Sequence, residues 1–129
     1  MKSKENTEPT TKYIKKYEWN IKDAKINNDH ILNDKDYKYV ILGVENQNGD
    51  LESGEYIIKT NGNKKASFMI YITNEYYESD SDIPETYGAF TAMVQGINNS
   101  DYTATLNKGQ YLYLVQNANE EGKVIVTKK

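Results

Sequence analysis

The amino-acid sequence predicts an all-β protein, namely an antiparallel β-sandwich or flattened barrel of about seven or eight short strands. Three observations lead to this prediction. Short runs rich in aromatic and β-branched residues follow one another along the chain. Clusters of Asn, Asp and Gly, which favour turns, separate most of these runs. After residue 36, no segment has the helical periodicity over about 10 to 15 residues that a βαβ crossover requires.

The N-terminal stretch MKSKENTEPTTK (1–12) has no apolar residue after Met1, so it predicts a flexible tail or tether. Residues 13–129 are expected to form a single sandwich domain. In 13–21, Trp19 and Ile21 alternate with polar neighbours, which favours a strand, although a short helical turn over 13–19 competes. The segment 22–37 is dense in Asn and Asp and predicts a loop, with room for one short strand or turn near His30.

The remaining strands follow from the period-two pattern and from β-favouring residues. In the run 66–73, Phe68, Ile70 and Ile72 share one face, while Met69 and Tyr71 share the other. Asn-Gly pairs at 48–49 and 61–62 are strong turn signals between neighbouring strands. The expected strands are 37–44, 55–60, 66–73, 89–95, 102–106, 110–115 and 123–127.

One short pattern occurs twice, as SGEYIIKT (53–60) and as KGQYLYLV (108–115). In both copies a glycine, Gly54 or Gly109, lies just before an expected strand and two positions before a tyrosine. A glycine can take a positive φ there without the steric cost of a Cβ atom. The doubled pattern therefore predicts two strands with equivalent roles, one in each half of a sandwich.

The same residues carry a family resemblance. The two stretches GDLESGEYII (49–58) and ATLNKGQYLYL (104–114) resemble a small all-β domain of secreted and lipid-anchored proteins in low-G+C Gram-positive bacteria. The resemblance covers about residues 38–129, and it departs from the usual pattern at Glu52-Ser53 and in a longer acidic insertion at 74–87. It implies a location in the cell envelope and supplies no catalytic residue. The matching positions are Asp50, Leu51, Gly54 and Tyr56 in the first stretch, and Leu106, Gly109, Tyr111 and Leu112 in the second.

Composition argues against several classes of function. All sixteen basic residues are Lys, and the net charge is −3, so the forked side chain that reads phosphates and bases is missing and no nucleic-acid partner is expected. The chain has no Cys, which excludes disulfides and thiolate chemistry. His30 is the one imidazole and lies in a turn-rich segment without a nucleophile motif. We therefore expect no catalytic residue, no metal site and no cofactor.

The acidic stretch NEYYESDSDIPE (74–85) is the candidate binding segment. Tyr76, Tyr77 and Tyr87 flank its acidic centre, and exposed rings of this kind stack on sugars or anchor protein partners. Packing of these rings over the edge of a small core is the competing interpretation. Asp80 and Asp82 alternate as oxygen ligands for Ca²⁺ do, but the glycine and distal glutamate of an EF-hand loop are missing, so a solvated acidic loop is the expectation.

These features together predict a non-enzymatic binding or structural module at the surface of a Gram-positive cell, with a cell-wall polymer or a protein as its partner. A membrane would be contacted only through an N-terminal lipid anchor that this chain does not carry, and Met1 would then replace a removed leader. The alternative is a cytoplasmic accessory protein of a phage or mobile element that acts through protein–protein contact.

Deletion of residues 1–12 should leave the melting temperature within about 2 °C of that of the full chain, because this segment has almost nothing to bury. Thermal unfolding followed by circular dichroism measures the difference. A much larger drop would mean that the segment docks against the domain, and the tether hypothesis would lose its support.

Overall fold

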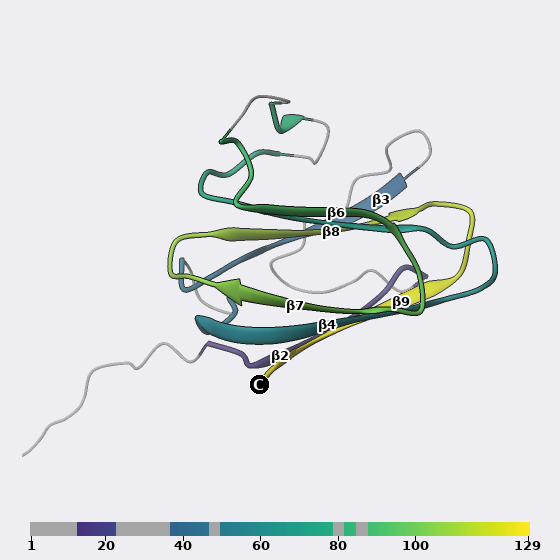
Figure 1. Ribbon diagram of the computed structural model, residues 1–129, viewed down its shortest axis with the longest axis horizontal. Helices are drawn as coiled ribbons and strands as arrows, with labels where there is room; N and C mark the ends of the chain where they lie inside the picture. The colour runs from purple at the N-terminus through teal and green to yellow at the C-terminus, as the bar shows by residue number, and fades with distance from the viewer. Residues whose placement is uncertain (1–12, 23–36, 47–49, 79–81, 85–87) are drawn as a thin grey trace, which may run out of the picture.

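The computed structural model describes residues 13–22, 37–46, 50–78, 82–84 and 88–129. Within them, eight strands form two four-stranded antiparallel sheets that pack as a sandwich (Figure 1), which confirms the predicted fold class. The first sheet has the order β2 (Lys16–Asn20), β9 (Gly122–Lys128), β4 (Gly54–Gly62) and β7 (Asp101–Leu106). The second has the order β3 (Tyr37–Gly43), β8 (Tyr111–Asn117), β5 (Phe68–Thr73) and β6 (Ala92–Ile97).

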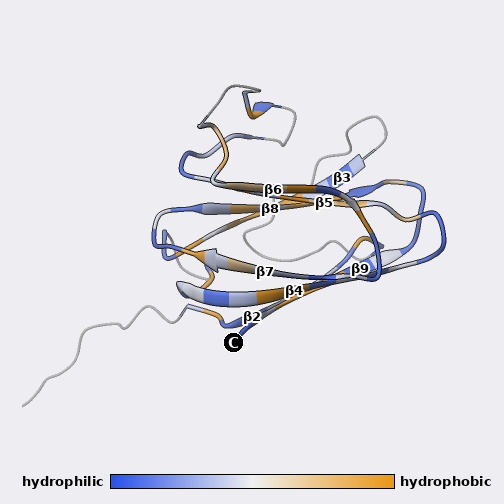
Figure 2. Ribbon diagram, viewed as in Figure 1, coloured by the Kyte–Doolittle hydropathy of each residue, from blue (hydrophilic) through white to orange (hydrophobic). Residues whose placement is uncertain are grey.

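The main core lies between the two sheets, and hydrophobic residues recur along the strands that enclose it (Figure 2). Phe68, Ile70 and Ile72 of β5 belong to this core, whereas Tyr71 lies on the other face of the strand, as the alternation predicts. Full burial of one such side chain contributes about 1.5 to 3 kcal/mol. The largest side chains with no exposed surface include Trp19, Tyr56, Phe68, Leu51, Ile58, Leu106, Leu112 and Leu114.

Residues 16–20 form a strand, so the competing helical turn over 13–19 is wrong. Strand β2 pairs with β9 along its length, with Trp19 opposite Val124. Trp19 is completely buried, and a strand places Tyr17 and Trp19 on the same inward face. Burial of two large rings by a five-residue segment outweighs any local helical preference of the lysine-rich sequence.

The Asn-Gly pair at 61–62 does not form the predicted turn. Strand β4 continues through Gly62, which pairs with Gly122 of β9, and the turn follows at Asn63–Lys65. A Cβ atom on Gly122 would lie 2.6 Å from Cζ of Phe68, and one on Gly62 would lie 3.0 Å from Cε1 of the same ring. These glycines therefore let Phe68 of the second sheet approach the first, which is a packing requirement and not a turn requirement.

Other strand boundaries also differ from the predictions by one to three residues. Strand β6 begins at Ala92 and not at 89, because Phe90 leaves the sheet and stacks on Tyr71 with 5.5 Å between the ring centroids. Strand β8 is two residues longer than expected at its C-terminal end. The tail 1–12, most of the predicted loop 22–37 with His30, and the Asn48-Gly49 turn lie outside the described residues.

The doubled pattern places one strand at the interior of each sheet, since β4 and β8 each have a neighbour on both sides. Gly54 has φ 146° and Gly109 has φ 91°, so both take positive values as the pattern predicts. The two tyrosines are not equivalent, however. Tyr56 is fully buried between the sheets, whereas Tyr111 lies on the outer face of the second sheet.

Backbone hydrogen bonds join the segments that lead into β4 and β8 through a shared stretch at Gly43–Glu45. On one side, Leu51 N–H donates to the Gly43 carbonyl, and Glu45 N–H donates to the Leu51 carbonyl, each at 3.0 Å. On the other side, Val44 N–H donates to the Gln110 carbonyl at 2.9 Å, and Gly109 N–H donates to the Val44 carbonyl at 2.8 Å. The segment before each repeated tyrosine thus pairs with the same short stretch of chain.

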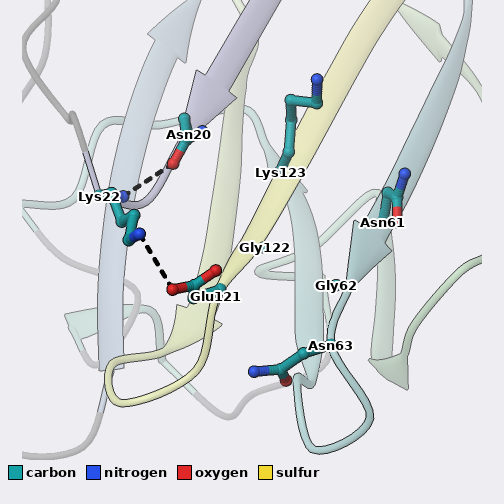
Figure 3. Close-up of a pocket in the computed structure, with 8 residues that line it drawn as sticks. All are labelled: Asn20, Lys22, Asn61, Gly62, Asn63, Glu121, Gly122 and Lys123. Carbon is teal, nitrogen blue, oxygen red and sulfur yellow. Dashed lines mark hydrogen bonds and ion pairs between the residues drawn. The ribbon is translucent and has the colours of Figure 1, made fainter.

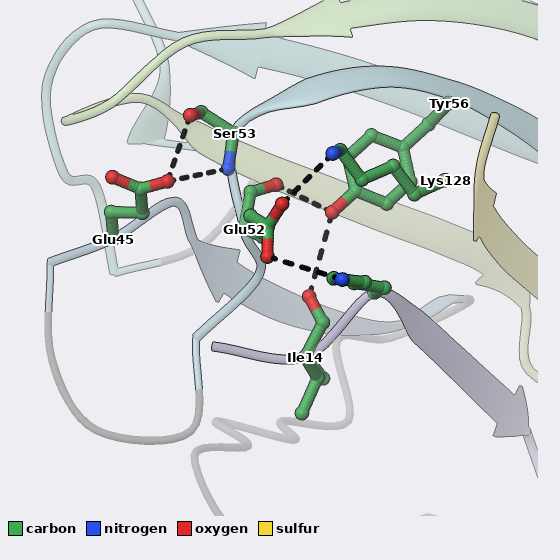
Figure 4. Close-up of polar contacts among 7 residues, drawn as sticks. Ile14, Glu45, Glu52, Ser53, Tyr56 and Lys128 are labelled. Atoms are coloured by element: carbon green, nitrogen blue, oxygen red, sulfur yellow. Dashed lines mark hydrogen bonds and ion pairs between the residues drawn. The ribbon is translucent and has the colours of Figure 1, made fainter. Parts of the chain in front are cut away.

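Side chains around the first copy form a polar corner (Figure 4). The backbone N–H and the hydroxyl of Ser53 both donate to Oε2 of Glu45, at 2.8 and 2.7 Å, and they lower the pKa of that carboxyl. Nζ of Lys128 lies 2.8 Å from Oε2 of Glu52, and this contact lowers the pKa of the Glu52 carboxyl. The Tyr56 hydroxyl donates to the Glu52 carbonyl. These contacts fix the start of β4 against the C-terminal strand.

Replacement of Gly109 by Val should cost about 1 to 3 kcal/mol of folding free energy, because a β-branched residue is strained at positive φ. Gly109→Asn should recover part of this loss, since Asn tolerates such backbone angles and no atom lies within 4 Å of the added Cβ. Urea unfolding measures both variants. Equal costs for Val and Asn would show that the backbone angle is not the reason for this glycine.

Candidate functional site

The outer face of the second sheet carries a second hydrophobic cluster, which we call the outer aromatic cluster. It lies on the side of the sheet that faces away from the main core. Described residues of the connection between β5 and β6 pack against this face, so that the acidic stretch contributes Tyr77 and Ile83 to the cluster. The buried members are Tyr39, Ile41, Tyr71, Ile83, Tyr113 and Val115, and Tyr37, Met69, Tyr77, Ala89, Phe90 and Tyr111 are partly buried against them.

The two ends of the β5–β6 connection are held together by Gln110. Its Nε2 donates to Oδ1 of Asn74 at 3.0 Å and to Oγ1 of Thr91 at 3.4 Å. Thr91 is fixed in turn, since its backbone N–H and its hydroxyl both donate to the Ile72 carbonyl. Gln110 is only 7% exposed, whereas Asn74 and Thr91 are exposed, so these hydrogen bonds join a buried residue to two surface positions. Gln110 therefore fixes the start and the end of the segment that crosses the cluster.

Tyr77 is anchored to the sheet by Tyr113. The Tyr77 backbone N–H donates to the Tyr113 hydroxyl at 2.7 Å, and that hydroxyl donates to the Tyr77 carbonyl at 3.0 Å. One residue later, the Tyr39 hydroxyl donates to the Glu78 carbonyl at 2.6 Å. Two buried tyrosines of the sheet thus bind the backbone of the acidic stretch, which satisfies polar groups that would otherwise be buried without partners.

Tyr76 differs from its neighbour because its ring remains 41% exposed. The ring packs edge-on against Tyr111, with 5.5 Å between the centroids and an angle of 65° between the planes. Partial burial, the charge of Glu78 and the nearby Tyr111 raise the pKa of the Tyr76 hydroxyl, in that order of importance. The acidic side chains Glu75 and Glu78 on either side of this segment are exposed. An aromatic ring is thereby presented to solvent beside negative charge.

The structure describes three of the five predicted ligand-binding residues. Tyr76 is exposed, Tyr77 is half-buried in the outer aromatic cluster, and Asp82 is exposed next to the buried Ile83. Asp80 and Tyr87 lie outside the described residues. The sequence interpretation missed Gln110 and Tyr113, although both lie in the second copy of the doubled pattern, which could have drawn attention to them.

A shallow polar hollow of about 450 Å³ lies near the end of the first sheet (Figure 3). Several of its polar groups already bind one another. Nζ of Lys22 lies 3.0 Å from Oε2 of Glu121, and Oδ1 of Asn20 accepts the Lys22 backbone N–H at 3.0 Å. Because these groups are paired within the protein and no aromatic ring lines the hollow, it is the weaker candidate for a ligand site.

Neither a metal centre nor a membrane-spanning helix is found in the part of the chain that the structure describes. Among these residues, no group of three or more His, Asp or Glu side chains is placed to hold a metal ion. The same ranges contain no helix with the length and apolar character needed to cross a membrane.

Comparisons with known proteins add no further assignment. No protein-family model, no curated protein and no solved structure matches this chain.

Folding stability should fall as the pH rises from about 10 to about 12, because burial raises the pKa values of Tyr56 and Tyr113 to about 12. Below pH 10 these residues are protonated in the folded and unfolded states, so they cause no pH dependence. Between about pH 10 and about pH 12, the hydroxyls of Tyr56 and Tyr113 lose their protons in the unfolded chain but keep them in the folded protein, which favours unfolding. Urea unfolding at pH 9 and pH 11.5 should show a smaller loss for Tyr113→Phe than for the wild type. An equal loss in both would contradict the assignment.

Proposed function

We propose that this protein is a non-enzymatic binding module of the bacterial cell envelope, and that its contact surface is the start of the acidic stretch with Tyr76 at the centre. The proposal rests on the different environments of two adjacent tyrosines, Tyr76 and Tyr77. The backbone of Tyr77 is hydrogen-bonded to Tyr113, whereas the ring of Tyr76 is 41% exposed. A solvent-exposed ring on an anchored backbone is suited to recognition, because little freedom remains to be lost on binding.

The surroundings of Tyr76 indicate what kind of group it would bind. Its edge contact with Tyr111 limits the orientations of the ring, and the residue is 41% exposed. Exposed Glu75 and Glu78 add negative charge close to that ring. An aromatic ring beside carboxylates attracts cationic groups and also stacks on sugar rings. A wall polymer that carries amino groups combines both features.

The cell-envelope location rests on the resemblance of the two glycine–tyrosine stretches and on the polar composition of residues 1–12. The non-enzymatic assignment rests on the sequence, which has no Cys and a single His in a turn-rich segment. The alternative, a cytoplasmic accessory protein, would use the same ring against a protein partner. The genomic sequence upstream separates the two, because a leader that ends in a lipidation motif supports only the first.

Replacement of Tyr76 by Ala should reduce binding to purified wall polymers at least about tenfold while changing stability by less than about 1 kcal/mol. Tyr76→Phe should retain most of the binding, because the ring is kept. Tyr113→Ala should instead cost about 3 to 5 kcal/mol of stability, because this ring is fully buried. Co-sedimentation with insoluble wall material and urea unfolding measure the two effects.

Thr103→Ala, an exposed position on β7 of the first sheet, is the matched control for binding. Wall binding that Tyr76→Ala leaves unchanged would exclude this ring as the contact. Failure of the wild-type protein to bind any wall polymer would move the proposal to the protein-partner alternative.

A further inference from the structure

Four strands lie at the edges of the two sheets, namely β2, β7, β3 and β6. An edge strand presents backbone N–H and C=O groups on one side, and natural proteins protect such edges with charged residues or Pro. Strand β2 carries Lys16 and Glu18, β3 carries Lys38, and β7 carries Asp101. Strand β6 has the sequence AMVQGI, without a charged residue or Pro. It is therefore the one edge strand of these four that has neither a charged residue nor Pro.

The exposed face of β6 is apolar at its centre. Met93 is 48% exposed, and it and Tyr76 are the two large hydrophobic residues with exposed side chains in the described part of the chain. Gln95 lies on the same face, where its Nε2 donates to the Tyr71 hydroxyl at 2.9 Å. The pairing of β6 with β5 shifts register near Gly96, which has φ 70°. The regular part of the edge is thus Ala92–Gln95.

We propose that β6 is a self-association edge, which pairs antiparallel with β6 of a second copy of this chain about a two-fold axis near Val94. The second sheets of the two copies would then form one continuous eight-stranded sheet. This inference does not depend on the proposed function, although a dimer would present two copies of Tyr76 to a polymeric ligand.

A second copy fits this edge because the pairing is self-complementary. Antiparallel pairing about Val94 places Met93 of one copy opposite Gln95 of the other. The two-fold axis repeats this pair, so an apolar side chain lies against an uncharged polar one at both positions. No like charges are opposed across such a pair, because β6 carries none. Each chain has a net charge of −3, which adds a weak long-range repulsion that salt screens.

The contact would be small. Four residues of edge bury less surface than the roughly 1,200 to 2,000 Å² of a stable protein complex, so the dimer should be weak and concentration-dependent. Added salt should strengthen it by screening the repulsion between the two acidic chains. This response is opposite to that of an association based on ion pairs.

Sedimentation of the full chain between about 10 µM and about 1 mM tests the proposal. The wild type should shift from monomer to dimer over this range. Met93→Lys should weaken the dimer at least about tenfold, because a Lys on each copy places positive charges near each other at the shared edge. Thr103→Lys is the matched control, since it adds the same charge at an exposed position of the edge strand β7 and should leave the dimer unchanged.

A wild type that stays monomeric at about 1 mM would overturn the inference, and so would a dimer that the two Lys variants weaken equally. Circular dichroism of each variant confirms that it is folded before sedimentation. Hydrogen exchange supplies an independent measurement, because the amides of Ala92–Gln95 should become more protected at high concentration while those of β7 do not.

Discussion

The pairing of residues 43–45 with the two segments that lead into β4 and β8 is the constraint on which the rest of the structure depends. Leu51 binds this segment from one side, and Gly109 and Gln110 bind it from the other. Because β4 follows Leu51 in the first sheet and β8 follows Gln110 in the second, these hydrogen bonds connect the two sheets at one end of the sandwich. The backbone entering each central strand is thereby held in place at this end of the sandwich.

The two outer faces of the sandwich differ in a way that explains the tyrosine-rich composition. The first sheet exposes paired charges, such as Glu18 with Lys123 and Lys59 with Asp101. On the second sheet, described residues of the β5–β6 connection pack against the outer face, and tyrosines supply both apolar surface and the hydroxyl groups that bind the backbone of Tyr77 and Glu78. A Phe in place of Tyr113 would fill the same space but would leave the Tyr77 amide without this partner.

Features set by local pattern could be predicted from the sequence, and features set by contacts between distant segments could not. The two faces of β5 follow from strict alternation, and the positive φ of Gly109 follows from a turn residue before a strand. The Asn61-Gly62 pair was misassigned because its glycine is required by Phe68, which belongs to the other sheet. Within the candidate site, the sequence grouped Tyr76 with Tyr77 and did not show which of the two rings is exposed, and nothing local shows that Gln110 reaches Asn74 and Thr91.

The Gln110 contacts have a consequence for how this protein can change over evolution or by design. Because Asn74 and Thr91 are fixed to each other through one buried side chain, the chain between them begins and ends at defined points on a rigid support. Insertions among the exposed residues between those two points would alter the surface, whereas loss of Tyr77 or Ile83 would also uncover the outer aromatic cluster. The sandwich is in this respect a display scaffold, in which the attachment points are specified and the buried residues of the displayed segment have to be kept.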